Sequence, residues 1–175
     1  KILDDDDKEC LVGTAGEIVS SGRIVMPEYL GRLEATQEAL WVDENGLHWL
    51  RTGDIGYLDE EGYLYIVDRK KDMILSGGQN IYPQDIEAVI VTHPDVEDVA
   101  VIGVKSTKWG ETPLALIALK NGKGNSDDIK TWTNKQLGKQ QRIAGLELID
   151  EIPRNPNGKI LKRELRKTYK DRVFD

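Results

Sequence analysis

The chain has 175 residues, with 24 lysine and arginine residues against 31 aspartate and glutamate residues, so its net charge is −7. An acidic chain lacks a global positive field that would attract nucleic acid, so we do not expect nucleic acid as its main partner. The single cysteine, Cys10, excludes an intramolecular disulfide, and no Cys or His spacing predicts a metal site. No apolar run reaches membrane-spanning length and no signal peptide is visible, so we expect a cytoplasmic protein with no transmembrane segment.

Residues 1–67 have the pattern of a small antiparallel β unit. A strand is predicted over residues 17–20 and a short helix over residues 33–40. An Asn-Gly pair in the turn at residues 43–46 lies between apolar segments and predicts a hairpin. The turn at residues 59–62 predicts a second hairpin. A unit of this size has too few residues for a large core and is commonly part of something larger.

From Met73 onward, predicted helices alternate with predicted strands. Pro83 suits the first position of a helix, because its φ is fixed and it needs no N–H there. Ser126 is expected to cap a second helix, and a basic helix is expected to follow the turn at residues 153–158. Buried strands are predicted over residues 99–104, 114–119 and 146–152. The order predicts an α+β domain in which a three-stranded sheet is flanked by helices.

Two clusters in the middle of the chain could bind an anionic or sugar-containing ligand. Asp54, in the segment Arg-Thr-Gly-Asp, could accept two hydrogen bonds from a vicinal diol such as a ribose, or could organise an Asx-turn. Arg69 could present a bidentate fork to phosphate or carboxylate. Ser76, Gly77 and Gly78 could offer backbone N–H groups to an anion or let a slender ligand pass, or could simply be a turn. The spacing is not that of a P-loop.

Lys159 and Trp109 are further candidates. Lys159 follows Asn-Gly and precedes the last helix, although helices favour cations at their C-termini, so it could stabilise charge on a transferred phosphoryl group. The other cations of that helix are interpreted as a solvated face. Trp109 lies on a loop between two predicted strands, where it could stack on a flat ligand if exposed or cover the sheet if buried.

Taken together and in this order, the motifs resemble the adenylate-forming enzymes. They are residues 51–54, residues 68–72, residues 77–83 with the following Ile86 and Glu87, and residues 157–159. The form Ser-Gly-Gly-Gln-Asn-Ile-Tyr-Pro is similar to acyl-CoA or aryl-CoA synthetases, which have a large N-terminal domain and a small mobile C-terminal domain.

The resemblance covers only the last part of such an enzyme. It implies that residues 1–68 end the large N-terminal domain as a β subdomain, that residues 69–72 are a hinge, and that residues 73–175 are the mobile C-terminal domain. The family's glycine-rich phosphate loop, adenine-binding segment and most of its acyl pocket have no counterpart here. The missing N-terminal domain is therefore an expected partner, and the chain alone is not expected to catalyse adenylation.

The implied reaction has two halves. A fatty or aryl carboxylate reacts with ATP, with Mg²⁺, to give acyl-AMP and pyrophosphate, and the thiol of CoA then gives acyl-CoA and AMP. The resemblance implies that Asp54 holds the ribose hydroxyls, that Arg69 contacts ribose or phosphate, that Lys71 is the hinge residue and that Lys159 assists adenylation. No protein metal ligand is implied. The CoA-binding residues that it implies are Gly77, Gly78 and Trp109.

One segment departs from the family pattern, and two other functions are open. Residues 140–142 are Gln-Gln-Arg where family members often have Tyr-Lys-Arg, so no CoA contact is assigned there. The chain could instead end an adenylation domain that loads a carrier protein, in which case a carrier domain should follow in the parent gene. It could also be a non-catalytic CoA- or nucleotide-binding module, which would bind its ligand tightly by itself.

Overall fold

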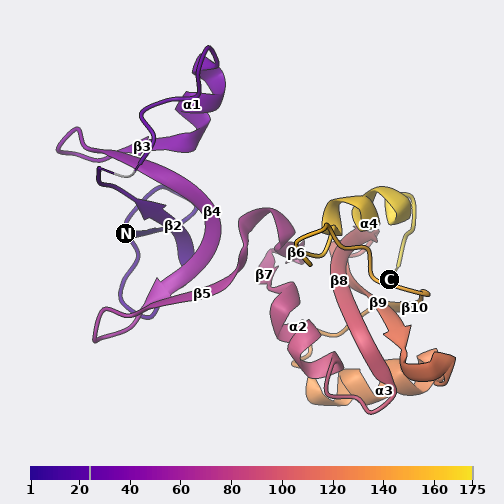
Figure 1. Cartoon of the computed structure of the whole chain (residues 1–175). Helices are drawn as coiled ribbons and strands as arrows, with labels where there is room; N and C mark the ends of the chain where they lie inside the picture. The colour runs from indigo at the N-terminus through magenta and orange to yellow at the C-terminus, as the bar shows by residue number, and fades with distance from the viewer. Residues whose placement is uncertain (24, 175) are drawn as a thin grey trace. The chain divides into compact units, whose positions relative to one another are not determined.

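The computed structural model describes residues 1–23 and 25–174 (Figure 1). The chain divides into two compact units, Lys1–Lys71 and Asp72–Asp175. Each unit contains one five-stranded sheet. The predicted α+β class is confirmed, with an antiparallel β unit first and a mixed helix and sheet unit second.

The first unit is a sheet built around one long central strand. Its elements are β1 (Ile2–Leu3), β2 (Gly16–Ser20), α1 (Leu33–Ala39), β3 (Leu40–Val42), β4 (His48–Leu58) and β5 (Leu64–Arg69). The strands are all antiparallel, in the order β1-β2-β4-β3, and β5 also pairs with β4. Both predicted hairpins are confirmed. They share β4, which continues through the Arg-Thr-Gly-Asp segment, with register shifts in its pairing with β2 and with β5.

A buried carboxylate ties the strands of the first unit together. Glu17 on β2 is only 5% exposed, and its Oε2 lies 2.8 Å from Nη1 of Arg51 and 2.9 Å from Nζ of Lys70. Arg51 also binds Asp7 at 2.6 Å. The hydrogen bonds to Asp7 and then Glu17 raise the pKa of Arg51, so this guanidinium stays charged. Arg51 therefore has a structural role in the first motif.

Asp43 organises the first hairpin turn. One carboxylate oxygen accepts the N–H groups of Asn45 and Leu47, each at 2.9 Å, and the other accepts Nε1–H of Trp49 at 3.0 Å. These bonds, led by the one from Leu47, lower the pKa of Asp43. The ionised form is favoured because every one of these donors binds it better than the neutral acid.

The stability of the first unit should therefore depend on pH through Asp43. Its contribution is fully present above the unfolded-state pKa of about 3.9 and is lost as the pH falls through the lower folded-state pKa. Asp43→Asn loses the charge and the acceptor for Trp49, so it should lower the melting temperature at pH 6, and the difference from wild type should shrink toward pH 3. Thermal unfolding followed by circular dichroism measures this, and a difference that stays constant with pH would contradict it.

The second unit has helices on both faces of its sheet. Its elements are β6 (Ile74–Ser76), β7 (Gln79–Ile81), α2 (Pro83–Ile90), β8 (Val96–Ser106), β9 (Gly110–Leu119), η2 (Lys120–Gly122), α3 (Ser126–Gln136), β10 (Gly145–Leu148) and α4 (Lys162–Tyr169), and a short 3₁₀ turn, η1 (Lys70–Asp72), precedes them. The strand order is β10-β9-β6-β7, with β8 also paired to β9. Only the pairing of β10 with β9 is parallel among those of the described strands.

Alternate side chains in the middle of β8 face two separate cores, which is why the sequence is continuously apolar from Val99 to Val104. Val99 and Val101 belong to one core with Ile86 of α2 and Ile129 of α3. Ala100, Ile102 and Val104, which alternate with them along the strand, belong to the other core with Leu165 of α4. Accordingly α2 and α3 lie on one side of the sheet and α4 on the other (Figure 1).

The structure corrects three local predictions. The sheet has five strands rather than three, because the segments on either side of Gly77 and Gly78 pair as the hairpin β6–β7. The cap of α3 is Asn125, not Ser126, since the Asn125 side chain accepts the N–H groups of residues 127 and 128 at 2.8 and 3.3 Å. The last strand ends at Leu148 rather than at residue 152, because Ile152 packs into the core beneath α4. Among the described residues, no helix is long and apolar enough to cross a membrane.

Candidate functional site

Asp54 and Arg69 lie opposite each other on β4 and β5 of the first unit. Nε of Arg69 is 2.8 Å from Oδ1 of Asp54, and the two side chains are 41% and 28% exposed. The turn at Gly53 is organised by Thr52, whose hydroxyl accepts the N–H of Asp54 at 3.1 Å and donates to the carbonyl of Ile18 at 2.8 Å. The Asp54 carboxylate is thus oriented by Arg69 and does not form the Asx-turn that was the alternative.

Gly77 and Gly78 form the tight turn between β6 and β7. Their φ angles are +58° and +82°, which suit a two-residue hairpin turn, a conformation that glycine adopts without strain. The N–H of Gly77 donates to the carbonyl of Trp109 at 2.9 Å, so it is already used within the protein and is not offered to an anion. A Cβ added to Gly77 would lie 2.8 Å from Cε3 of Trp109. The structure therefore brings together two of the residues that the sequence implicated in CoA binding.

Trp109 is half exposed at the turn between β8 and β9. Its exposed fraction is 47%, and Nζ of Lys108 lies 4.8 Å from the centroid of its ring. The Ser106 hydroxyl accepts the N–H of Trp109 at 3.1 Å and fixes the turn. Of the two alternatives left open for Trp109, the structure favours an exposed ring, with one part covering Gly77 and another part accessible.

A cavity of about 320 Å³ opens beside Gly77 and Trp109. Its lining combines apolar groups with two cations from the segment after α3; the lining residues are Ser76, Gly77, Trp109, Thr112, Lys139, Gln140, Arg142, Ile143 and Ala144. Sequence reasoning assigned no ligand contact to residues 140–142, yet the fold carries Gln140 and Arg142 to this cavity. The signal that could have found them is the presence of Lys139 and Arg142 in a short loop after a helix. Two of the predicted site residues, Gly78 and Lys159, do not line this cavity.

Lys159 lies on a tightly bonded loop that precedes α4. Oδ1 of Asn155 accepts the N–H groups of Asn157 and Lys159 at 3.0 and 2.9 Å. The N–H of Asn155 donates to the carbonyl of Lys159 at 2.9 Å, and Gly158 closes the turn with a φ of +81°. The Lys159 side chain is exposed and has no ion pair within the described part of the chain. An ammonium held this way can reach an external anion.

Two cations of α4 bind carboxylates and are not part of a purely solvated face. Lys162 Nζ lies 2.7 Å from Oε1 of Glu87, and the two side chains are 11% and 16% exposed. The same carboxylate oxygen accepts the N–H of Val101 at 2.7 Å, so Glu87 joins α2, β8 and α4. Arg166 Nη1 lies 2.7 Å from Oδ1 of Asp72. The interpretation of these two side chains as solvated is therefore wrong, because each has a partner that the sequence separates from it widely.

The predicted hinge residue, Lys71, lies between two anchored neighbours in η1. Lys70 binds Glu17, which belongs to the first unit, and Asp72 binds Arg166, which belongs to the second. Lys71 itself is exposed and forms no ion pair with any described residue. Its role as a hinge stays a prediction.

The family profile for the AMP-binding enzyme C-terminal domain matches residues 85–159, which run from α2 to the Lys159 loop. Residues 85–159 are thus those of an AMP-binding enzyme C-terminal domain. The match includes the turn that carries Trp109 and the loop that carries Lys159, and it leaves out β6, β7 and α4 of the second unit.

Similarity to known proteins extends beyond this domain into the first unit. The chain is 43% identical over 163 residues to a 2-succinylbenzoate–CoA ligase of Geobacillus kaustophilus, covering 93% of this chain and 32% of that protein. It is 46% identical over 154 residues to the long-chain-fatty-acid–CoA ligase FadD13 of Mycobacterium tuberculosis, covering 88% of this chain and 30% of that one. The crystal structure of ATP-bound MatB from Rhodopseudomonas palustris matches with a TM-score of 0.88 at 34% identity, over 97% of this chain and 33% of that chain.

The chain spans about a third of the length of the curated relatives that it matches. It corresponds to the C-terminal portion of acyl-CoA synthetases in the adenylate-forming superfamily, as its motifs predicted.

Proposed function

We propose that the protein containing this chain is an AMP-forming acid–CoA ligase. It converts a carboxylate and ATP to acyl-AMP and pyrophosphate, and then converts acyl-AMP and CoA to acyl-CoA and AMP. The observation that carries the proposal is the cavity that Gly77, Trp109 and Arg142 line, because it combines a glycine turn, a flat ring and positive charge. The names of the relatives, which are ligases of 2-succinylbenzoate and of long-chain fatty acids, support the same reaction class.

In the first half-reaction, the chain would supply three polar side chains. Lys159 would place its ammonium on the phosphate oxygens where negative charge develops. Asp54, oriented by Arg69, would accept hydrogen bonds from the ribose hydroxyls. In the described residues no group of three or more His, Cys, Asp or Glu side chains could hold a metal ion, so Mg²⁺ enters this proposal together with ATP.

In the second half-reaction, the chain would bind CoA beside β6 and β9. The cavity volume of about 320 Å³ is at the lower end of the range of about 300–1,000 Å³ for small-molecule sites, which suits part of an extended ligand. The pantetheine arm would pass Gly77 and Gly78, and a base could stack on the exposed part of the Trp109 ring. Lys139 and Arg142 would attract the phosphates.

The proposal includes a large N-terminal domain as partner and the hinge at residues 69–72. Exposed apolar side chains on the first unit support contact with further protein. Leu11, Tyr63 and Ile66 are 84%, 65% and 65% exposed, so their apolar surface is available to pack against another domain. Without that domain, the chain would not catalyse adenylation alone. The whole enzyme would work in the cytoplasm, where ATP and CoA are available.

The alternative of loading a carrier protein is less well supported by the cavity. A carrier protein presents pantetheine through a single phosphodiester, whereas free CoA also brings a nucleotide with additional phosphates. The two cations and the exposed indole at the cavity match the larger and more negative ligand.

The test is an assay of the full-length gene product with ATP, Mg²⁺, CoA and a panel of carboxylates that includes 2-succinylbenzoate and fatty acids. We expect AMP and an acyl-CoA with at least one carboxylate, and acyl-AMP when CoA is omitted. Calorimetry of the 175-residue chain with CoA, ATP and AMP provides the second arm. Tight binding by the chain alone, together with no turnover by the full-length protein, would instead establish a binding module.

A further inference from the structure

Arg154 binds a carboxylate and the Lys159 loop at the same time. Its Nη2 lies 2.9 and 2.7 Å from the two carboxylate oxygens of Asp98, and its Nε lies 3.2 Å from Oδ2. Its remaining terminal nitrogen, Nη1, donates to the carbonyl of Gly158 at 2.7 Å. The planar guanidinium thus fixes the residue directly before Lys159 to a strand that is distant in sequence.

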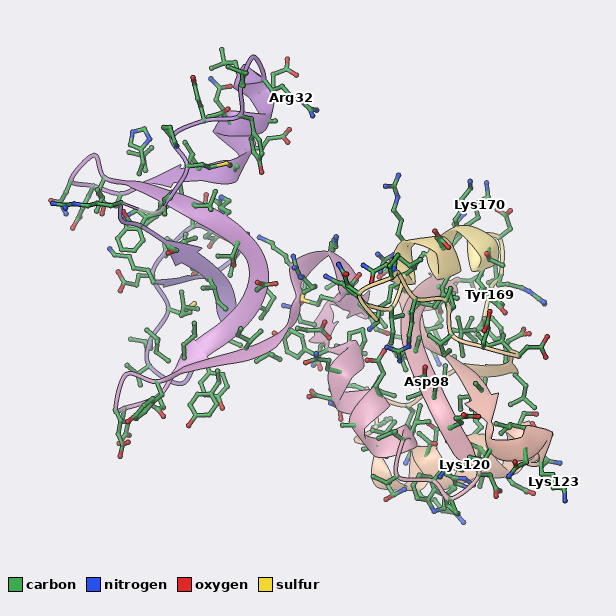
Figure 2. All side chains as sticks on the ribbon, viewed as in Figure 1. Arg32, Asp98, Lys120, Lys123, Tyr169 and Lys170 are labelled. Atoms are coloured by element: carbon green, nitrogen blue, oxygen red, sulfur yellow. The ribbon has the colours of Figure 1, made fainter. Side chains whose placement is uncertain are left out.

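The strand that carries Asp98 is irregular at this contact. Asp98 lies on β8 (Figure 2), immediately after a register shift in the pairing of β8 with β9 between Val96 and Asp98. An irregularity of this kind re-aims a side chain relative to the regular alternation of a strand. The N–H of Val99 donates to Oδ1 of Asp98 at 2.9 Å, which further restricts the carboxylate.

The other hydrogen bonds of the loop are all local, while Ile152 and Ile160 on either side of it pack into the core that includes Leu165 of α4. Asn155 holds Lys159 from within the loop, through contacts that span four residues of sequence. These local bonds set the shape of the turn, but they do not fix the turn to the sheet. On the N-terminal side of Lys159, Arg154 provides a directional polar attachment to β8, 56 residues away from its partner Asp98. On the other side, Lys162 attaches the start of α4 to Glu87.

We propose that Arg154, held by Asp98, is a positioning residue that fixes the Lys159 ammonium for phosphoryl chemistry. This inference rests on the proposed function, because it assigns Arg154 a role only through Lys159. Arg154 itself needs to touch no substrate. Since a misplacement of about 1 Å can cost about 10²-fold in rate, a loop that is still folded but no longer fixed to β8 would lower the rate of acyl-AMP formation substantially.

The test compares Arg154→Gln and Asp98→Asn with the matched control Arg163→Gln in the full-length protein. Arg163 is an exposed cation close to the loop, with no ion pair in the described part of the chain. Both half-reactions are measured separately: acyl-AMP formation, and acyl-CoA formation from supplied acyl-AMP. We expect Arg154→Gln and Asp98→Asn to slow the first about 10- to 100-fold and to change the second less than threefold, and Arg163→Gln to change neither.

The double variant Arg154→Gln with Lys159→Ala separates positioning from general loss of structure. If Arg154 acts through Lys159, the double variant should be no slower in acyl-AMP formation than Lys159→Ala alone. Independent losses that multiply, or an equal decrease in both half-reactions, would overturn the inference. If Lys159→Ala retains wild-type adenylation, the proposed function of Lys159 fails. If Lys159→Ala slows adenylation but Arg154→Gln behaves like Arg163→Gln, the positioning role of Arg154 fails and the function of Lys159 stands.

Discussion

Replacing Lys159 by alanine is expected to slow acyl-AMP formation by about 10²–10³-fold, the usual effect of removing one preorganised group that stabilises transition-state charge. Acyl-CoA formation from supplied acyl-AMP should stay near the wild-type rate, because the loop does not contribute to the cavity beside Gly77. Single-turnover measurement of each half-reaction in the full-length protein checks the difference.

The structure also indicates how this variant should behave as a protein. The Lys159 side chain is exposed, and the loop is held by its backbone and by Asn155, so the melting temperature should change little. Arg163→Ala removes a nearby exposed cation and serves as the control for the loss of positive charge. An equal decrease in both half-reactions of Lys159→Ala would contradict the assigned role.

Replacing Gly77 by alanine is expected to impair the second half-reaction, the formation of acyl-CoA from acyl-AMP. The new Cβ would lie 2.8 Å from Cε3 and 3.3 Å from Cζ3 of Trp109, so the indole must move away from its place at the cavity. Since the passage for the thiol arm would narrow as well, acyl-CoA formation from supplied acyl-AMP should fall by at least about 10-fold, or about 1.4 kcal/mol in activation free energy. Acyl-AMP formation should be nearly unchanged.

Gly122→Ala is the matched control for backbone strain at Gly77. The φ angle of Gly122 is +63°, close to the +58° of Gly77, but a Cβ there would meet no atom within 4 Å. Both variants carry the cost of a left-handed alanine, about 1–2 kcal/mol of stability, and only Gly77→Ala adds the collision with Trp109. The same thioester-forming rate in both variants would show that Gly77 has no role at the site.

The sequence predicted the fold well wherever the pattern was local. The two hairpins of the first unit, and the start of α2 at Pro83, follow from turn residues and helix signals within a few positions. The extra hairpin β6–β7 was missed because its strands are only three residues each, too short to show a period. The N-cap of α3 differed by one position, since Asn125 and Ser126 are both good caps and only geometry selects between them.

The candidate site was predictable to the extent that its residues form motifs. Lys159, Gly77 and Asp54 were found because they stand in short recognisable segments. Arg142 was not assigned a role, because its segment departs from the family pattern. The fold nevertheless brings it to the cavity of Gly77 and Trp109. The partnership of Arg154 with Asp98 spans 56 residues and leaves no periodic signal, so only the structure could reveal it.

The anchoring of η1 on both sides of Lys71 has a mechanical consequence. Lys70 is bound to Glu17 and Asp72 to Arg166, each within its own unit, so a hinge here would have one unanchored residue with only two soft torsion angles. A lysine has few allowed regions for that pair of angles, essentially the β and right-handed α wells. Such a hinge would allow a small number of discrete domain orientations instead of a continuous range. The backbone chemical shifts of Lys71 alone would then report which orientation the enzyme occupies.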